Sequence, residues 1–182
     1  MFDNIQKMTS QDKLKKYIRN IPDFPVKGIQ FKDITTLLED AHALHETAMI
    51  ITDYYKDRGI TKVVGIESRG FILGSILAYN LNAGFIPIRK PGKLPADTIE
   101  EIYEKEYGCD KIQIHKNTLT ESDVVLMHDD LLATGGTSTA ACNLVRKIGV
   151  KKIYLNFIIE LKELCGRSNI PEDIELMTLL KF

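Results

Sequence analysis

The spacing of hydrophobic residues changes several times along this chain, between continuous apolar blocks and helical spacing. Four short apolar blocks predict buried strands, at residues 62–66, 84–88, 124–127 and 153–159. Apolar positions at helical spacing predict helices over 70–80 and 138–148, so strands and helices alternate as they do in α/β proteins. The fourth block is almost wholly apolar, as in a parallel sheet covered on both faces. We therefore expect an α/β fold with a central, mostly parallel sheet flanked by helices.

The N-terminal part and one middle segment depart from this alternation. Their patterns predict a short amphipathic helix over 10–19 and a longer one from about 40 to 58, which Gly59 ends. Pro22 and Pro25 interrupt the chain between the two helices, because proline disfavours helix at and before its position. Residues 91–116 are polar and charged, and they alternate in strand fashion over 111–115. This segment predicts a flexible β-hairpin flap, and long excursions of this kind are often lids.

Length, composition and charge narrow the class of protein. The 182 residues are 44% hydrophobic, and they suit a single domain over 1–182 without a signal peptide or a bilayer-spanning stretch. Because 24 basic and 25 acidic residues leave a net charge of −1, we expect no nucleic-acid or membrane partner. Three scattered cysteines are typical of reduced thiols rather than of disulfides or zinc ligands. These features predict a cytoplasmic location.

The strand at 124–127 leads into the most informative segment of the chain. That segment reads Asp129-Asp130-Leu131-Leu132-Ala133-Thr134-Gly135-Gly136-Thr137. Its two glycines allow a tight turn in which successive N–H groups point at one anion, and the following helix adds its positive N-terminal end. The adjacent carboxylates can accept hydrogen bonds from vicinal hydroxyls or help to hold a hydrated magnesium ion. A phosphate site beside a diol site predicts a ribose 5-phosphate ligand.

An ordinary helix start is the alternative interpretation of this segment, with Thr137 as the cap and the acidic pair complementing the helix dipole. The whole string, with its apolar lead-in and amphipathic helix, favours the phosphate cradle. Two common nucleotide motifs do not fit. The nearest P-loop spelling, 65–70, continues with Phe71 instead of lysine, and no GxGxxG occurs.

The string resembles the phosphoribosyl pyrophosphate (PRPP) motif of the type I phosphoribosyltransferases, and its form DDLLATGGT resembles their adenine-specific branch. Three further blocks match in the same order. They resemble the hood (21–35), the pyrophosphate loop (65–71), and the start and tip of the mobile catalytic loop (89–95 and 104–108). The resemblance covers nearly the whole chain and implies the type I phosphoribosyltransferase fold. It also implies a small hood over about 1–38 and a mobile flap over about 91–116.

The resemblance implies roles for individual residues. Asp129 and Asp130 would meet the ribose hydroxyls. The 5-phosphate would be held by Ala133, Thr134, Gly135, Gly136 and Thr137. Pyrophosphate would be bound by Ser68 and Arg69, with positive charge added by Arg89, Lys90 and Lys93.

The base site and the flap complete the implied set. The purine would stack between Phe31 and Leu131, while the backbone of Gln30 and the side chain of Lys32 read its edge. At the flap tip, Glu106 would manage the purine protons and Tyr107 would cover the closed site. Arg69 and Lys90 would join Glu106 as catalytic residues.

The implied reaction is displacement of pyrophosphate from PRPP by N9 of adenine, which gives AMP. Mg²⁺ is the implied cofactor, held mainly through PRPP, pyrophosphate and water, with Asp129 or Asp130 as a candidate direct ligand. A homodimer is implied in the same way. Two alternatives stay open: transfer to xanthine, hypoxanthine, guanine or orotate, and a PRPP-sensing regulator on the same fold. A regulator usually carries a DNA-binding module, for which this chain has no basic helix.

Two positions depart from the family pattern. Lys32 stands where the family usually has arginine, and lysine keeps the charge but loses the planar fork of the guanidinium. His128 stands where the strand normally ends in an apolar residue. We expect His128 to be a buried or hydrogen-bonded structural residue rather than a catalytic one.

Overall fold

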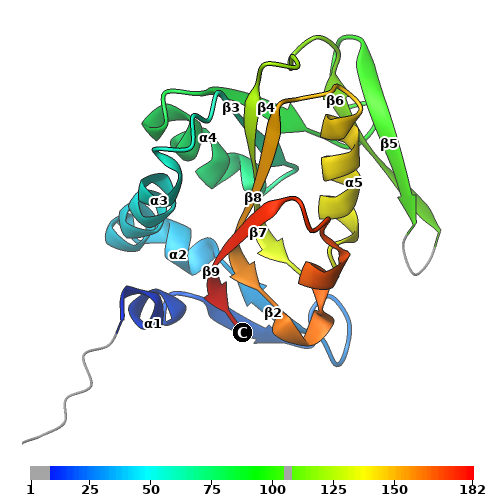
Figure 1. Ribbon diagram of the computed structural model, residues 1–182. Coiled ribbons are helices and arrows are strands. Elements are labelled where there is room, and N and C mark those ends of the chain that lie inside the picture. The colour runs from blue at the N-terminus through cyan, green and yellow to red at the C-terminus, as the bar shows by residue number, and fades with distance from the viewer. Residues whose placement is uncertain (1–8, 105–107) are drawn as a thin grey trace, which may run out of the picture. The chain divides into compact units, whose positions relative to one another are not determined.

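The structure, a computed structural model, describes residues 9–104 and 108–182, and the chain divides into two units, Met1–Ile50 and Ile51–Phe182. The larger unit contains a five-stranded sheet with the order β4-β3-β7-β8-β9, in which every pair of neighbours is parallel (Figure 1). The strands are β3 (Lys62–Ile66), β4 (Gly84–Ile88), β7 (Val124–Leu132), β8 (Lys152–Glu160) and β9 (Glu175–Lys181). The predicted parallel sheet is therefore confirmed.

Helices α4 (Gly70–Asn80) and α5 (Gly136–Arg146) connect parallel strands of this sheet. The sheet order takes the chain from β3 to β4 in one direction and from β7 to β8 in the other. Because such crossovers are right-handed, the two helices cover opposite faces of the sheet (Figure 1). Eight of the nine residues of β8 are buried between these layers. This burial explains why that segment is so apolar.

β7 is longer than the sequence predicts. The apolar pattern stops at Met127, but the strand continues to Leu132, so Asp129 and Asp130 lie within the strand and not in the loop after it. The physical reason is pairing with β8, which holds Asp129 opposite Phe157 and Leu132 opposite Glu160. The acidic pair is therefore fixed by the sheet.

The segment predicted as a hairpin forms β5 (Thr98–Glu104) and β6 (Cys109–His115), an antiparallel pair. Arg89 and Gln113 exchange two backbone hydrogen bonds of 2.9 and 2.7 Å, which join the hairpin to the end of β4. Ile112 and Ile114 are buried in the main hydrophobic core of this unit. The base of the hairpin is thus an integral part of the larger unit.

The smaller unit contains α1 (Ser10–Lys15), the antiparallel strands β1 (Arg19–Pro22) and β2 (Gln30–Asp33), and α2 (Thr35–Glu39). Helix α3 (Ala41–Tyr55) begins in this unit and ends in the larger one. The prediction of a helix to residue 19 is wrong, since α1 ends at Lys15 and Arg19 begins β1. The Arg19 guanidinium pairs at 2.5 Å with buried Asp33 of the neighbouring strand.

Two short turns complete the list of elements. Two 3₁₀ turns, η1 (Lys162–Leu164) and η2 (Gly166–Asn169), connect β8 to β9. His42 and His45 are exposed on α3. Within residues 9–104 and 108–182, no helix has both the length and the apolar character needed to cross a membrane.

Candidate active site

A pocket of about 220 Å³ lies at the carboxyl ends of β3, β4 and β7. Its walls come from Glu67 after β3, Lys90 after β4, Asp129 of β7 and the loop that leads into α5, and the hairpin adds Tyr103. β3 and β7 are neighbours in the sheet. From β3 the chain passes outward to β4 on one side, and from β7 it passes outward to β8 on the other. Open α/β sheets bind their ligands at such a switch point.

The loop between β7 and α5 makes a tight turn at the start of a helix. Gly135 has a φ of +85°, in the left-handed region that favours glycine, and it precedes the first residue of α5. Among the described residues, no side chain caps this end of the helix. Residues 133–138 line the pocket, so the positive end of an 11-residue helix lies at the pocket wall.

The acidic pair lies beside this loop. Asp130 is 3% exposed, and its carboxylate accepts a 2.5 Å hydrogen bond from Nε of Arg69. Burial, together with the adjacent Asp130 carboxylate, raises the pKa of Asp129 well above its usual value. A ligand that brings hydroxyl donors or positive charge to Asp129 would relieve this unfavourable burial.

The turn after β3 adds further charged residues to the site. A second pocket shares Glu67 and Asp129 with the first and adds Ser68, Arg69 and Asp130. Glu67 accepts hydrogen bonds of 3.3 and 3.1 Å from the Arg89 guanidinium and one of 2.9 Å from the backbone N–H of Lys90. Partial burial acts to raise the pKa of Glu67, but these hydrogen bonds outweigh it and hold that pKa below its usual value. Glu67 therefore holds the Arg89 guanidinium and the backbone at Lys90.

The hairpin is hydrogen-bonded to the start of α5, just after the β7–α5 loop. Thr137 Oγ1 donates to the Tyr103 hydroxyl at 3.1 Å, and that hydroxyl donates to Asp110 at 3.3 Å. Nζ of Lys90 lies 3.5 Å from the same carboxylate. Sequence reasoning missed Tyr103, Asp110 and Glu67. Only Glu67 had a local signal, since it stands inside the 65–71 block.

The structure brings together most of the predicted site residues of the larger unit. Those that line the two pockets are Ser68, Arg69, Arg89, Lys90, Asp129, Asp130, Leu131, Ala133, Thr134, Gly135, Gly136 and Thr137. Lys93 lines neither pocket but is nearby, where its carbonyl accepts a 3.1 Å hydrogen bond from Arg89. Glu106 and Tyr107 lie outside the described residues.

The predicted base-binding residues belong to the smaller unit. Phe31 is half-buried on β2, with its ring edge-on to Phe24 at a centroid distance of 5.1 Å. Lys32 is also half-buried. Gln30 is exposed and accepts a 2.7 Å hydrogen bond from Asn20. This aromatic pair, with Phe31 on β2 and Phe24 in the segment between β1 and β2, offers an apolar ring face of the kind that a purine can contact.

His128 is a buried structural histidine, as its sequence context predicts. It is 0% exposed, and its Nδ1 lies 2.7 Å from Oδ1 of Asn156. Burial lowers the pKa of His128 from 6.5 to about 4. The ring is therefore neutral at physiological pH.

We expect His128 to make the protein sensitive to mild acid. Its ring gains a proton near pH 6.5 in the unfolded chain but only near pH 4 in the folded protein, so its contribution to stability is lost as the pH falls from 6.5 to 4. The loss is about 3.5 kcal/mol at about 1.4 kcal/mol per pH unit. Urea unfolding across this range should show a flatter pH dependence for His128→Asn than for the unsubstituted protein. His45→Asn, on the exposed face of α3, is the control and should keep the original slope; equal slopes in all three proteins would contradict the prediction.

Comparisons with known proteins identify the family of this chain. The sequence model of the phosphoribosyl transferase domain matches residues 33–168. The adenine phosphoribosyltransferase of Bacteroides thetaiotaomicron is 64% identical over 171 residues, which cover 94% of this chain and 97% of that protein. Among solved structures, the adenine phosphoribosyltransferase of Rhodothermus marinus has a TM-score of 0.90 at 46% identity and covers 94% of this chain and 98% of its own.

A second solved structure, from Giardia lamblia, is an adenine phosphoribosyltransferase in complex with 9-deazaadenine. It has a TM-score of 0.90 at 44% identity, over 96% of this chain and 99% of its own. The predicted type I phosphoribosyltransferase fold is confirmed. The chain belongs to the phosphoribosyltransferase family, among its adenine phosphoribosyltransferases.

Proposed function

We propose that this chain transfers the 5-phosphoribosyl group of PRPP to N9 of adenine, releasing pyrophosphate and forming AMP for purine salvage. The observation that carries the proposal is one pocket with three parts: the helix-start loop at 133–138, the acidic residue Asp129, and the basic group Lys90. A 5-phosphate, a ribose diol and a pyrophosphate require these three kinds of group side by side. The family membership supports PRPP as the ligand of these groups.

The proposed roles follow the chemistry of each group. The 133–137 loop surrounds the 5-phosphate, while Asp129 and Asp130 accept hydrogen bonds from the ribose hydroxyls. As the bond at C1 breaks, positive charge develops on the sugar and negative charge on pyrophosphate. Arg69, Lys90 and Lys93 stabilise the departing pyrophosphate, Arg89 adds charge from the end of β4, and Ser68 donates to it.

Mg²⁺ is the cofactor we propose. The described residues contain no cluster of three or more His, Cys, Asp or Glu side chains that would bind a metal ion. Mg²⁺ bound to nucleotide-like substrates typically uses one or two carboxylates together with phosphate oxygens and water, and the Asp129–Asp130 pair fits that requirement. When bound, the ion would neutralise charge on pyrophosphate. We also propose a homodimer and a cytoplasmic location, without nucleic-acid or membrane partners.

A panel of bases tests the proposed reaction. With PRPP and Mg²⁺, adenine should give AMP, while hypoxanthine, guanine, xanthine and orotate should react at least about 100-fold more slowly, because a base site built for hydrogen bonds leaves its polar groups unpaired with the wrong base. Product formation is followed by chromatography. A faster reaction with another base would reassign the substrate. PRPP binding without turnover of any base would favour a regulator instead.

We expect Glu106→Ala to lower kcat about 100-fold, the lower range for loss of a general acid or base. The proposed reason is that Glu106, at the flap tip, manages the purine protons. Steady-state kinetics with saturating adenine and PRPP would measure it. Glu104→Ala is the matched control, because Glu104 is the exposed last residue of β5, and it should retain activity. Deleting the flap is a poorer test, because Ile112 and Ile114 of the hairpin are buried in the core. Unchanged turnover in Glu106→Ala would remove Glu106 from the mechanism.

A further inference from the structure

We propose that η2, Gly166–Asn169, is a positioning element for the phosphate-binding loop, and that Asn169 is the residue through which it acts. This inference rests on the proposed function, because it concerns the loop assigned to the 5-phosphate. Neither the local sequence nor the family motifs assign a role to η2. It is outside the pocket and contacts the loop from behind, so Asn169 acts through the loop and not on the substrate.

Asn169 contacts the loop and the helix that follows it. Its side-chain Nδ2 donates a 2.8 Å hydrogen bond to the carbonyl of Thr134, and its own carbonyl accepts one of 2.8 Å from Thr139 Oγ1. In a trans peptide, the Thr134 carbonyl and the N–H of Gly135 point in opposite directions. Holding that carbonyl therefore fixes the direction of the N–H of Gly135, a residue that lines the pocket.

Close backbone packing supports the same contact. A Cβ atom on Gly166 would overlap the carbonyl oxygen of Ala133. In return, a Cβ atom on Gly135 would lie 2.6 Å from the carbonyl oxygen of Gly166. The two glycines let η2 and the loop approach more closely than any side chain would permit.

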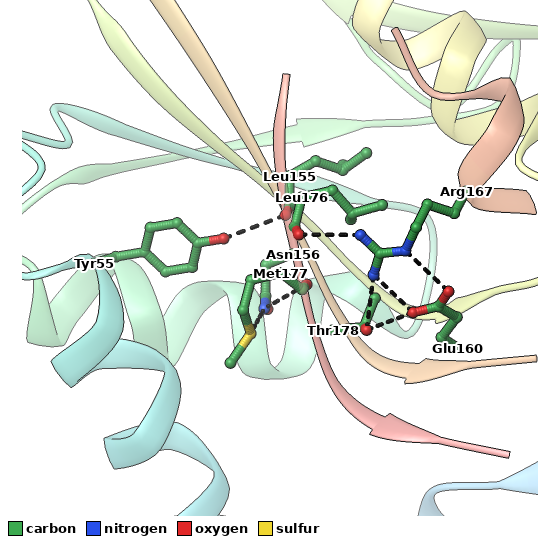
Figure 2. Close-up of polar contacts among 8 residues, drawn as sticks. All are labelled: Tyr55, Leu155, Asn156, Glu160, Arg167, Leu176, Met177 and Thr178. Carbon is green, nitrogen blue, oxygen red and sulfur yellow. Dashed lines mark hydrogen bonds and ion pairs between the residues drawn. The ribbon is translucent and has the colours of Figure 1, made fainter. Parts of the chain in front are cut away.

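Arg167 anchors η2 to the sheet (Figure 2). Its guanidinium donates to both carboxylate oxygens of Glu160, at 3.0 and 2.7 Å, and to Thr178 and the Leu176 carbonyl, at 3.1 and 3.3 Å. Glu160 is the last residue of β8 and is 7% exposed. A bidentate pair at a buried carboxylate has a fixed geometry. Arg167 thus holds η2 against β8 and β9, and Asn169 holds the loop against η2.

Asn169→Ala tests the inference, with Ser168→Ala as the matched control. Ser168 lies in the same turn, and its hydroxyl donates a 2.7 Å hydrogen bond to the Cys165 carbonyl rather than to the loop. We expect Asn169→Ala to raise KM for PRPP and the Kd for AMP about fivefold, the usual contribution of one hydrogen bond. kcat and KM for adenine should stay within about twofold. Weaker binding of the phosphate affects the ground state and the transition state equally, so it raises KM for PRPP without lowering kcat. Thr139→Val removes the second hydrogen bond and should act in the same direction.

A purely structural role would give a different result. In that case Asn169→Ala would lower Tm as Ser168→Ala does and leave KM for PRPP and the calorimetric Kd for AMP unchanged, which would overturn the positioning role while the proposed function stands. If the unsubstituted protein neither binds AMP nor makes it from PRPP and adenine, the proposed function fails and the inference fails with it. A selective loss of affinity for both phosphate ligands in Asn169→Ala, absent from Ser168→Ala, supports the inference.

Discussion

Asp130→Ala is expected to lower kcat/KM for PRPP about 1000-fold. A hydrogen bond to a charged group contributes about 1.5 to 3 kcal/mol, and the substitution removes the proposed bond to the ribose and the 2.5 Å bond that orients Arg69. Two such losses amount to about 4 kcal/mol, or about three orders of magnitude in rate. Initial rates at saturating adenine and varied PRPP would measure the effect.

Stability should respond much less than activity to this substitution. The Asp130 carboxylate is one of the causes that raise the pKa of Asp129, so its removal relieves a repulsion while it breaks the pair with Arg69. Asp173→Ala is the control, because Asp173 pairs with Arg146 on the surface. Retention of more than about a tenth of kcat/KM by Asp130→Ala would contradict the assigned role. A Tm drop as large as that of a core substitution would show that the loss is one of folding.

The acidic pair also lowers the stability of the folded protein. Two adjacent carboxylates within a mostly buried strand, one of them 3% exposed, repel each other and lose solvation. A hydrophobic pair would suit β7 better if only stability mattered. Strongly perturbed acids in a pocket are typical of functional sites, and here the perturbed group is Asp129.

Local patterns were sufficient to predict much of this fold. The strands at 62–66 and 84–88 and the helix at 70–80 match the structure residue for residue, because each is an uninterrupted apolar or helical block between glycine or polar breaks. The hairpin was also predicted, since β6 alternates along its length. The two glycines and the acidic pair all line the two adjoining pockets, and a local pattern could bring them together because they lie within nine consecutive residues.

Features that depend on distant partners were not predicted. The extension of β7 to Leu132 results from pairing with β8, which apolar patterning within β7 does not report. The Arg69–Asp130 pair joins residues 61 positions apart. Asn169 meets Thr134 across 35 positions, from a short polar turn without a motif of its own. These contacts depend on the packing of the sheet, which no local pattern describes.

Gly135→Ala is expected to lower kcat/KM for PRPP by about three orders of magnitude as well. A Cβ atom at this position would lie 2.6 Å from the Gly166 carbonyl oxygen, a backbone atom that cannot rotate away. The φ of +85° adds about 1 to 2 kcal/mol of strain for any residue with a side chain. To relieve both, the loop must move, and the N–H groups proposed to bind the 5-phosphate move with it. Loss of one or two charge-assisted hydrogen bonds contributes about 1.5 to 3 kcal/mol more for each bond.

Gly149→Ala separates backbone strain from the function of the loop. Gly149 has a nearly equal φ of +83°, but it lies beyond the far end of α5, and a Cβ atom there would lie 3.4 Å from its nearest neighbour, the flexible side chain of Glu121. Both variants should lose stability in thermal unfolding, whereas only Gly135→Ala should lose affinity for AMP in calorimetry. Equal kinetic constants in the two variants would mean that the loop tolerates displacement. In that case the phosphate would have to be held mainly by side chains such as Thr134 and Thr137, and not by the backbone.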